Sequence, residues 1–137
     1  MSDFVVVDSS VAYKWLHPEG EDHVTEALGY LWQHRDGEVV VVAPDTLFVE
    51  IANALRNSKL QPAETLDLID ALVSLTIETF ESDAKRLRAA AVLSYRHRIS
   101  VYDALFLALA EELGCPLVSA DHRAFGQVDS GVEIRLL

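Results

Sequence analysis

The apolar residues of this chain fall into short runs separated by longer stretches in which they recur every three or four positions. β-Branched residues fill the runs at 4–8 and 39–43 without polar alternation, which is typical of strands buried on both faces of a parallel sheet. The run at 116–119 has the same character. Residues 76–81 and 132–137 alternate more, so they are predicted to be outer or edge strands. About five strands are therefore expected.

Helical spacing fills the intervals between these runs. Apolar stripes around Leu28 and Ile51 have the period of amphipathic helices, and Pro62 suits the first turn of another. Because strands and helices alternate along the chain, the predicted fold class is α/β, a three-layer α/β/α sandwich around a central, mainly parallel sheet.

Helix boundaries can be predicted in the last third of the chain. Ser82 is a candidate N-cap for a helix that runs to about Arg98. Ser100 is a candidate N-cap for the next helix, which is expected to stop at Gly114 because glycine commonly ends helices.

Length and composition narrow the class of protein. The 137 residues fit a single domain, 1–137, and half of them are hydrophobic, which is unlike a disordered chain. The single cysteine, Cys115, excludes an internal disulfide and a cysteine-rich zinc site, so a reducing cytoplasm is the expected location. The first residues do not resemble a signal peptide, and no apolar run approaches the roughly 20 residues of a membrane span. No membrane association is expected.

The charge of the chain argues against broad electrostatic binding of nucleic acid. Twenty-two acidic residues oppose 11 basic ones, giving a formal net charge of −11, and nucleic acid is itself an anion. This objection weakens if several acidic residues form a cation site, because a bound divalent ion inverts the local charge that a phosphate meets.

Four carboxylates are predicted to meet at one edge of the sheet. Asp8 and Asp121 follow strands directly, at the carboxyl ends where ligands bind in open α/β sheets. Glu50 and Asp103 lie early in helices whose starts right-handed crossovers bring to the same edge. Carboxylates placed together repel one another unless a cation joins them. Oxygen ligands alone indicate Mg²⁺ or Mn²⁺, which would activate water for attack on phosphorus.

Each carboxylate also has a purely structural interpretation. Ser100 and Asp103 fit a helix capping box, Asp8 and Asp121 fit helix N-caps or turns, and Glu50 fits a solvated helix position. Two observations favour a cation site over these structural roles: Glu50 has apolar neighbours in the sequence, and all four acids are predicted to lie at the same edge of the sheet.

Four segments carry a resemblance to a known family. "VVVDSSVAYKWL", "APDTLFVEIANALR", "SVYDALFLALAEELGCPLVSAD" and the following "HRAF" resemble the segments that define PIN-domain proteins, and most closely the VapC-like toxins of bacterial and archaeal toxin–antitoxin pairs. The resemblance extends over nearly the whole chain. It implies a Mg²⁺-dependent ribonuclease with four catalytic acids, in which Asp8, Asp103 and Asp121 are the metal ligands and Glu50 acts through a water on the metal.

The resemblance also implies supporting residues and partners. Ser10 and Ser119 match positions where the family has small hydroxyl residues that orient the acids, although Ser119 replaces the commoner threonine. Asn53, three residues after Glu50 and so on a neighbouring face of the helix, matches a position that is often asparagine. The family further implies an antitoxin that often delivers a basic residue into the acidic pocket, and a homodimer.

Two further groups of residues bear on partners. Five of the 11 basic residues lie on the helix that leads to Asp103, either as a solvated face favoured by the helix dipole or as a phosphate-tracking strip in which Arg96 and Arg98 contact RNA. An apolar patch for an antitoxin segment is expected from two helices. Its candidate residues are Val11, Ala12, Trp15, Leu16, Leu47 and Ile51.

Three functional hypotheses follow. The first is a metal-dependent endoribonuclease that acts as the toxin of a toxin–antitoxin pair. The second is a catalytically silent PIN-like regulatory module whose acidic pocket receives a basic side chain of a protein partner. The third is a phosphoacceptor domain with Asp8 modified, which requires a lysine near the site, and none of the predicted strands ends in one.

Overall fold

A computed structural model describes residues 3–137 of the chain, and residues 1–2 of the predicted domain lie outside the described part. A five-stranded sheet with the order β3-β2-β1-β4-β5 forms its centre, and every neighbouring pair is parallel. This confirms the predicted sheet, with β3 and β5 at its edges as expected. The strands are β1 (Asp3–Val7), β2 (Val39–Pro44), β3 (Glu78–Phe80), β4 (Leu117–Ser119) and β5 (Ile134–Leu136).

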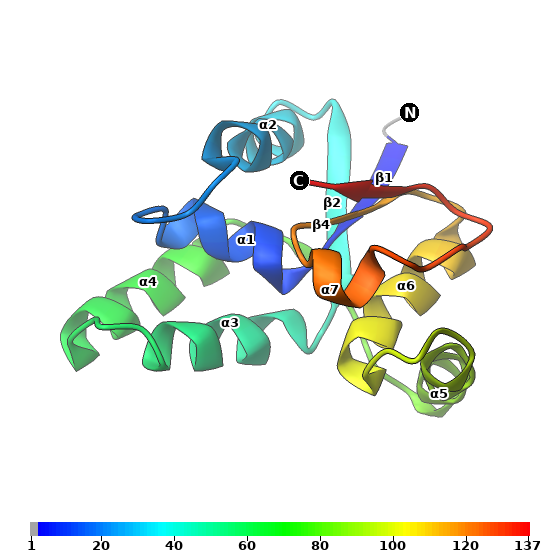
Figure 1. Cartoon of the computed structure of the whole chain (residues 1–137). Coiled ribbons are helices and arrows are strands. Elements are labelled where there is room, and N and C mark those ends of the chain that lie inside the picture. Colours follow the sequence, from blue (N-terminus) through cyan, green and yellow to red (C-terminus); the bar gives the residue numbers. More distant parts are fainter. Residues whose placement is uncertain (1–2) are drawn as a thin grey trace.

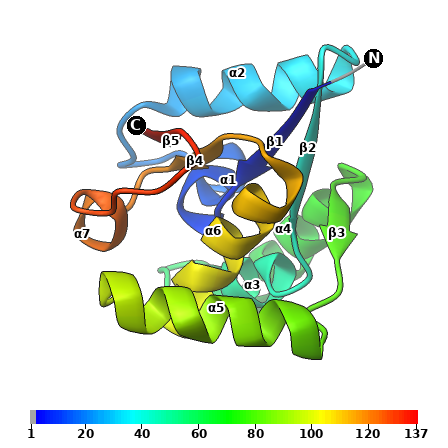
Figure 2. The ribbon, with the colours of Figure 1, turned by 90° about the vertical axis from the view of Figure 1, so that its right-hand side faces the viewer.

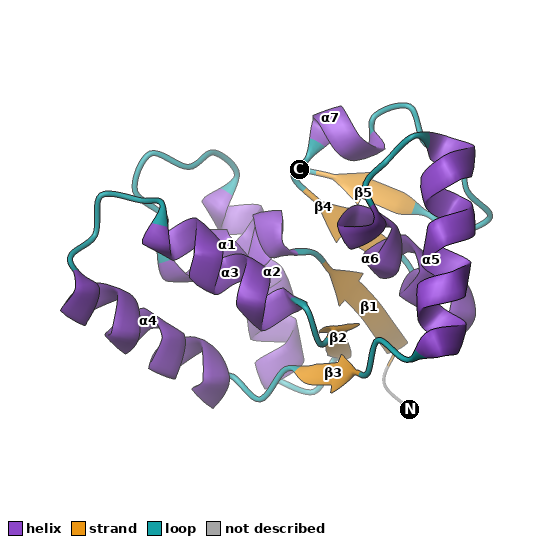
Figure 3. Ribbon diagram, turned by 90° about the horizontal axis from the view of Figure 1, so that it is seen from below, coloured by secondary structure: helices purple, strands orange, loops and turns teal. Residues whose placement is uncertain are grey.

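Helices cover both faces of the sheet, which confirms the three-layer sandwich. Four of them, α1 to α4, lie on one side, and α5 and α6 lie on the other (Figure 3). α6 contacts the sheet and α5 packs on the outside of α6 (Figure 2). The helices are α1 (Ser9–Leu16), α2 (Val24–Arg35), α3 (Leu47–Arg56), α4 (Pro62–Ser74), α5 (Ala84–His97), α6 (Val101–Leu113) and α7 (His122–Phe125).

Burial explains why the central strands and α6 lack polar alternation. Val5, Val6 and Val7 of β1 are all buried, because helices cover both faces of the strand. Residues 104–110 of α6 are likewise all buried, since the helix lies between the sheet and α5. Within residues 3–137, no helix has the length and apolarity to cross a membrane.

The strand order creates a switch point between β1 and β4. The chain adds β2 and β3 on one side of β1, then returns to place β4 and β5 on its other side. Ligands of open α/β sheets bind outside the carboxyl ends of the strands at such a point. Asp8 follows β1 and Asp121 follows β4, so both acids lie there. The first turns of α1, α3, α6 and α7 gather at the same edge (Figure 1).

The helix caps match the predictions with one exception. Ser100 caps α6, and Gly114 ends it with a left-handed φ of 63°. Asp83, and not Ser82, caps α5 by accepting a hydrogen bond from the N–H of Arg86. The Ser82 hydroxyl instead donates to Asp45 Oδ1 at 2.6 Å, joining the loop after β2 to the loop after β3.

Candidate active site

Asp8 is held by hydrogen bonds at both of its carboxylate oxygens. Its Oδ1 accepts from the N–H groups of Ser10 and Val11, as an N-cap of α1, and from the Ser10 hydroxyl at 2.5 Å. Its Oδ2 accepts from the Ser119 hydroxyl at 2.5 Å. With 4% of its surface exposed, the carboxylate is fixed in one orientation at the end of β1.

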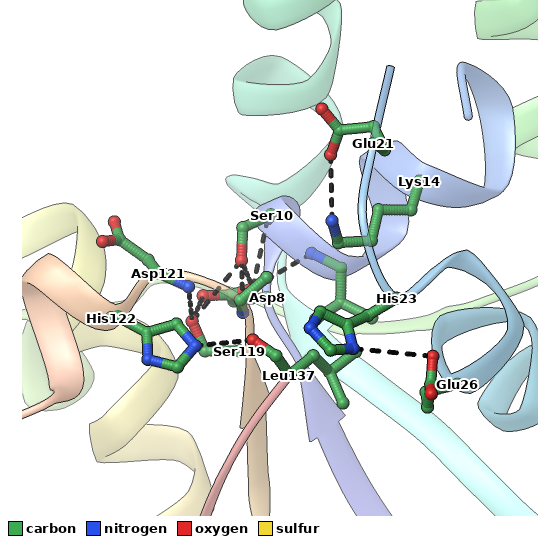
Figure 4. Close-up of polar contacts among 12 residues, drawn as sticks. Asp8, Ser10, Lys14, Glu21, His23, Glu26, Ser119, Asp121, His122 and Leu137 are labelled. Carbon is green, nitrogen blue, oxygen red and sulfur yellow. Dashed lines mark hydrogen bonds and ion pairs between the residues drawn. The ribbon is translucent and has the colours of Figure 1, made fainter. Parts of the chain in front are cut away.

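The two serines also fasten the turn after β4 to Asp8. Ser10 Oγ accepts from the N–H of Ala120 at 2.8 Å, and Ser119 Oγ accepts from the N–H of Asp121 at 2.9 Å. Figure 4 shows this network around Asp8, with the Asp121 side chain to one side of it. Both serines predicted to orient the acids thus contact the Asp8 side chain, and Ser119 also contacts the backbone of Asp121.

Asp121 and Asp103 both lie in helix first turns. Asp121 is the N-cap of α7, where its Oδ1 accepts from the N–H of Ala124 at 2.9 Å. In α6, the N–H of Asp103 donates to Ser100 Oγ at 3.0 Å. Burial, and then the charge of Asp121, raises the pKa of the Asp103 carboxyl above its usual value.

Glu50 lies in the first turn of α3 and has one oxygen without a partner. Its Oε1 accepts a long hydrogen bond, 3.4 Å, from the Ser9 hydroxyl. Its Oε2 is buried and accepts no hydrogen bond of good geometry within residues 3–137. The Thr46 hydroxyl, which also lacks a partner there, lies near enough to offset a small part of the rise that burial causes in the pKa of Glu50. A buried acceptor without a donor is costly, so this oxygen has capacity for a cation or a proton.

The four carboxylates act on one another electrostatically. Burial raises the pKa of Asp8 to about 6, against its hydrogen bonds and with a further contribution from Asp103. Burial, then the charges of Asp103 and Asp8, raises the pKa of Glu50 to about 7. Asp121 joins the group through its effect on Asp103. The structure therefore places the four predicted acids near enough to one another for their charges to interact.

This donor set suits a hard divalent cation by its chemistry. All of the acids offer carboxylate oxygens, the ligands that Mg²⁺ and Mn²⁺ prefer, and their raised pKa values mean that a cation would relieve repulsion. No group of three or more acidic, histidine or cysteine side chains within residues 3–137 is placed to hold a metal ion in this conformation.

The remaining predicted residues, Asn53, Arg96 and Arg98, form no hydrogen bond or ion pair with the four acids within residues 3–137. Asn53 is exposed on α3, and its side chain has no hydrogen-bond partner within residues 3–137. Arg98 ends α5 with a left-handed φ of 57°, two residues before the cap of α6. Arg96 lies along a groove that Glu111 and Glu112 also line.

The basic helix is therefore not a continuous cationic strip. Arg86 donates from Nε and Nη2 to the two carboxylate oxygens of Glu112, at 3.1 and 3.0 Å. Its guanidinium also lies over the ring of Phe80. This part of α5 is occupied in holding α5 against α6.

The predicted apolar patch is wrong for most of its residues. Val11, Ala12, Leu47 and Ile51 are all buried, because α1 and α3 pack against each other. Trp15 is partly buried, with its Nε1–H donating to the carbonyl of Ala27 on α2. The exposed apolar residues of α3 and α4 are instead Val49, Leu66 and Val73.

Sequence reasoning missed two residues beside the acids. Ser9 donates to Glu50, and Lys14 is a buried lysine on α1, bound to Glu21. Lys14 stands three residues after Val11, on the apolar stripe of its helix, and a charge on such a stripe is a signal that could have identified it.

Comparisons with known proteins assign the chain to a family and a fold. A family model described as PIN domain matches residues 5–131. No curated protein shows significant similarity to the sequence.

Solved structures resemble the chain over almost its whole length. VapBC2 of Rickettsia felis, bound to a DNA fragment from its promoter, is 14% identical with a TM-score of 0.72, covering 98% of each chain. DNA-bound VapBC of Salmonella typhimurium is 16% identical with a TM-score of 0.69, covering 98% of this chain and 97% of that one. VapC20 of Mycobacterium tuberculosis, described as a sarcin-ricin loop cleaving toxin, is 17% identical with a TM-score of 0.70, covering 93% and 98%. At these identities the similarity shows a shared fold.

Proposed function

The chain belongs to the PIN-domain family, and on this premise we propose that it is a metal-dependent endoribonuclease that acts as the toxin of a toxin–antitoxin pair. Its substrate is RNA, in keeping with the RNA-loop cleavage described for VapC20, which has the same fold. The proposed reaction is hydrolysis of a phosphodiester bond within the RNA strand.

The observation that carries this proposal is the electrostatic coupling of four carboxylates at the switch point of the sheet. Asp8, Glu50 and Asp103 have raised pKa values for the shared reasons of burial and mutual repulsion. A purely structural cap is expected to be stabilised by its helix and to keep a low pKa. Raised pKa values in a group of neighbouring carboxylates support a cation site, because a bound cation would favour their ionised forms.

Asp8, Asp103 and Asp121 would hold Mg²⁺, or Mn²⁺ in its place. When bound, the ion supplies activation of the attacking water and neutralises charge that develops on the phosphate. The hydroxyls of Ser10 and Ser119 hold the Asp8 carboxylate in orientation. Glu50, with a pKa of about 7 and a free Oε2, is suited to take up a proton near neutral pH.

Cleavage of a mixed pool of structured RNAs by the partner-free protein tests the proposal. We expect cutting with Mg²⁺ or Mn²⁺, none with chelator, and a loss of at least about 100-fold in Asp103→Asn. Asp70→Asn, at an exposed position of α4, serves as the matched control and should cut as well as wild type. Equal cutting by wild type and Asp103→Asn would count against the proposal, since it would indicate a contaminating nuclease or a different site.

The unfilled acceptor at Glu50 Oε2 supports the second candidate, a silent module that receives an arginine or lysine from a protein partner. Asp8→Asn separates the two functions. A silent module would lose partner affinity in this variant and show no RNA cleavage in wild type, whereas a ribonuclease loses cleavage.

Two protein partners belong to the proposal. An amphipathic antitoxin segment would cover exposed apolar residues of α3 and α4, including Val49 and Leu66. A second copy would cover the exposed apolar residues of α5 and α6, among them Val92, Tyr95 and Tyr102. A protein that stays monomeric at high concentration when purified alone would exclude the homodimer.

A further inference from the structure

Lys14 is a buried cation that the proposed chemistry does not use. The residue is 6% exposed, on α1, and its Nζ donates to Glu21 Oε1 at 3.0 Å. Glu21 lies in the segment between α1 and α2, with its side chain 32% exposed. Burying an ammonium is costly even when it is paired. An apolar residue in place of Lys14 could hold this segment against α1 without that desolvation energy. The ion pair is therefore a candidate for a functional role in addition to packing.

The ion pair lines an open pocket of about 390 Å³. The other lining residues are Ser9, Ser10, Tyr13, Ala54 and Ala120. Ser9 and Ser10 donate their hydroxyls to Glu50 and Asp8 respectively. Figure 4 shows the Lys14–Glu21 pair beyond Ser10 as seen from Asp121. A group bound in the pocket would therefore lie directly beside a phosphate at the acidic site.

The chemistry of the pocket suits a nucleobase better than a phosphate. The charges of Lys14 and Glu21 cancel, so the pocket has no net positive charge to attract a phosphate. The pair instead presents N–H donors next to carboxylate acceptors, as the edge of a base requires. Tyr13 adds an aromatic ring, and burial followed by the charges of Glu21 and Glu19 raises the pKa of its phenol, which stays protonated.

We propose that this pocket binds the base of the nucleotide next to the scissile phosphate and selects guanine, an inference that rests on the proposed ribonuclease activity. Guanine presents the acceptor O6 beside the donors N1–H and N2–H. The Lys14 ammonium donates to O6, and the two Glu21 oxygens accept the two N–H groups. Among the four RNA bases, guanine alone offers two adjacent donors on this edge, which a carboxylate accepts in a bidentate manner.

Cleavage of an RNA library with randomised positions around the cut tests the assignment. We expect guanine to be enriched at one position beside the cut in the wild-type products. Glu21→Gln keeps the size of the side chain and a bond to Lys14 but loses one of the paired acceptors, so the preference should fall about tenfold or more. Glu26→Gln, on α2 outside the pocket, is the matched control and should keep the preference.

Binding of the four ribonucleoside 5′-monophosphates provides a readout that needs no cleavage. In ¹H–¹⁵N spectra, we expect GMP to shift the amide signals of Ser9, Tyr13 and Ala54 at lower concentration than AMP, CMP or UMP. Glu21→Gln and Lys14→Met should remove this advantage while their spectra remain those of a folded protein. Should Lys14→Met fail to fold, Glu21→Gln alone decides the outcome.

The outcomes separate this inference from the proposed function. RNA cleavage with no guanine preference, or with a preference that Glu21→Gln leaves intact, overturns the pocket assignment and leaves the ribonuclease in place. Guanine-selective binding in a protein that cuts no RNA overturns the ribonuclease and leaves the pocket. Equal shifts with all four nucleotides, or none at the pocket amides, overturn the assignment.

Discussion

Asp8 and Asp121 are each both a helix N-cap and a member of the candidate acidic site, the two interpretations that the sequence allowed. Each accepts N–H hydrogen bonds as a helix N-cap, and each takes part in the acidic region at the switch point. A carboxylate has about four acceptor positions, and at Asp8 hydrogen bonds from Ser10, Val11 and Ser119 already use these positions. At Asp121 the two roles are compatible, because the hydrogen bond that it accepts as a cap uses only one of them. Identifying a cap therefore does not exclude a site.

Among the non-acidic residues, Ser119 should have the most direct effect on metal binding, because it contacts both Asp8 and Asp121. Ser119→Ala removes a donor from Asp8 Oδ2 and the acceptor of the Asp121 N–H. We expect Mg²⁺ or Mn²⁺ affinity, measured by calorimetry, to fall about 10-fold or more, and the free energy of unfolding to fall by about 1–3 kcal/mol. Ser119→Thr, which retains the hydroxyl, should restore both. Exposed Ser74→Ala is the control, and an unchanged metal affinity in Ser119→Ala would exclude this role.

Glu50 should make the metal-free protein less stable as pH rises. Its folded-state pKa of about 7 exceeds the ordinary 4.5, so the folded state holds the proton more tightly than the unfolded state does. The stability that this proton provides is complete below about pH 4.5 and is lost as pH rises through about 7.

Glu50→Gln, which cannot ionise, should therefore gain stability relative to wild type between pH 5 and pH 8. The expected gain is on the order of 1 kcal/mol, because partial exposure screens the charge. Urea unfolding with chelator at the two pH values measures it. The same difference between variant and wild type at both pH values would show that Glu50 ionises normally.

At the scale of elements, the site depends on helices that start at the carboxyl edge. The N-cap Ser100 and the C-cap Gly114 set the ends of α6, and the start of α6 carries Asp103. The clamp between Arg86 and Glu112 holds α5 on the outer face of α6. These contacts fix the position of Asp103 relative to the strand ends, and among them only Ser100 contacts an acid directly, by accepting from the Asp103 N–H.

A histidine forms a hydrogen bond with the part of β2 that does not pair with β3. His34 Nδ1, on α2, accepts from the N–H of Val41 at 3.0 Å, in a part of β2 that precedes its pairing with β3 at Val42. His34→Ala leaves this N–H without an acceptor, so we expect a loss of about 1–3 kcal/mol in the free energy of unfolding.

Hydrogen exchange provides a local test of this contact. The Val41 amide should exchange faster in His34→Ala, whereas Gln33→Ala, at the exposed neighbouring position of the same helix, should leave it protected. Equal protection in the two variants would show that the histidine contributes nothing to β2.

For the whole molecule, a net charge of −11 means that RNA, the proposed substrate, would approach against the overall electrostatic field. Local features must then provide the attraction, chiefly a cation at the acids and the few basic side chains that are not engaged elsewhere. Within residues 3–137, Arg96 and Arg98 form no ion pairs, unlike Arg86 on the same helix.

We expect RNA binding to depend weakly on monovalent salt. If Arg96 and Arg98 each neutralise one phosphate, the slope of log affinity against log salt is about −1.4 for single-stranded RNA. The double charge reversal Arg96→Glu/Arg98→Glu should weaken binding and flatten this slope toward zero. Arg35→Glu on α2 applies one such charge reversal elsewhere and should keep the slope. An unchanged slope in the double variant would show that Arg96 and Arg98 lie on a solvated face of α5 and do not contact RNA.

The sequence by itself determined the five strands, their mainly parallel arrangement and the sandwich, and it predicted that four acids lie at one edge of the sheet. Strands buried on both faces appear in the sequence as runs of β-branched residues, and helices appear as apolar residues with a 3.6-residue period. Acids that directly follow strands are expected at the carboxyl edge of the sheet. All of these signals are local in the chain or follow from general rules of α/β topology.

Only the tertiary structure decided which residues surround the acids. The apolar faces of α1 and α3 are as suited to a core as to a docking patch, and their mutual packing buried them. The hydrogen bond from Ser119 to Asp8 spans 111 residues, and the pocket beside the acids joins Lys14 and Glu21 to Ala54 and Ala120. Such contacts depend on how segments distant in sequence meet, and hydrophobic periodicity along the chain carries no information about that.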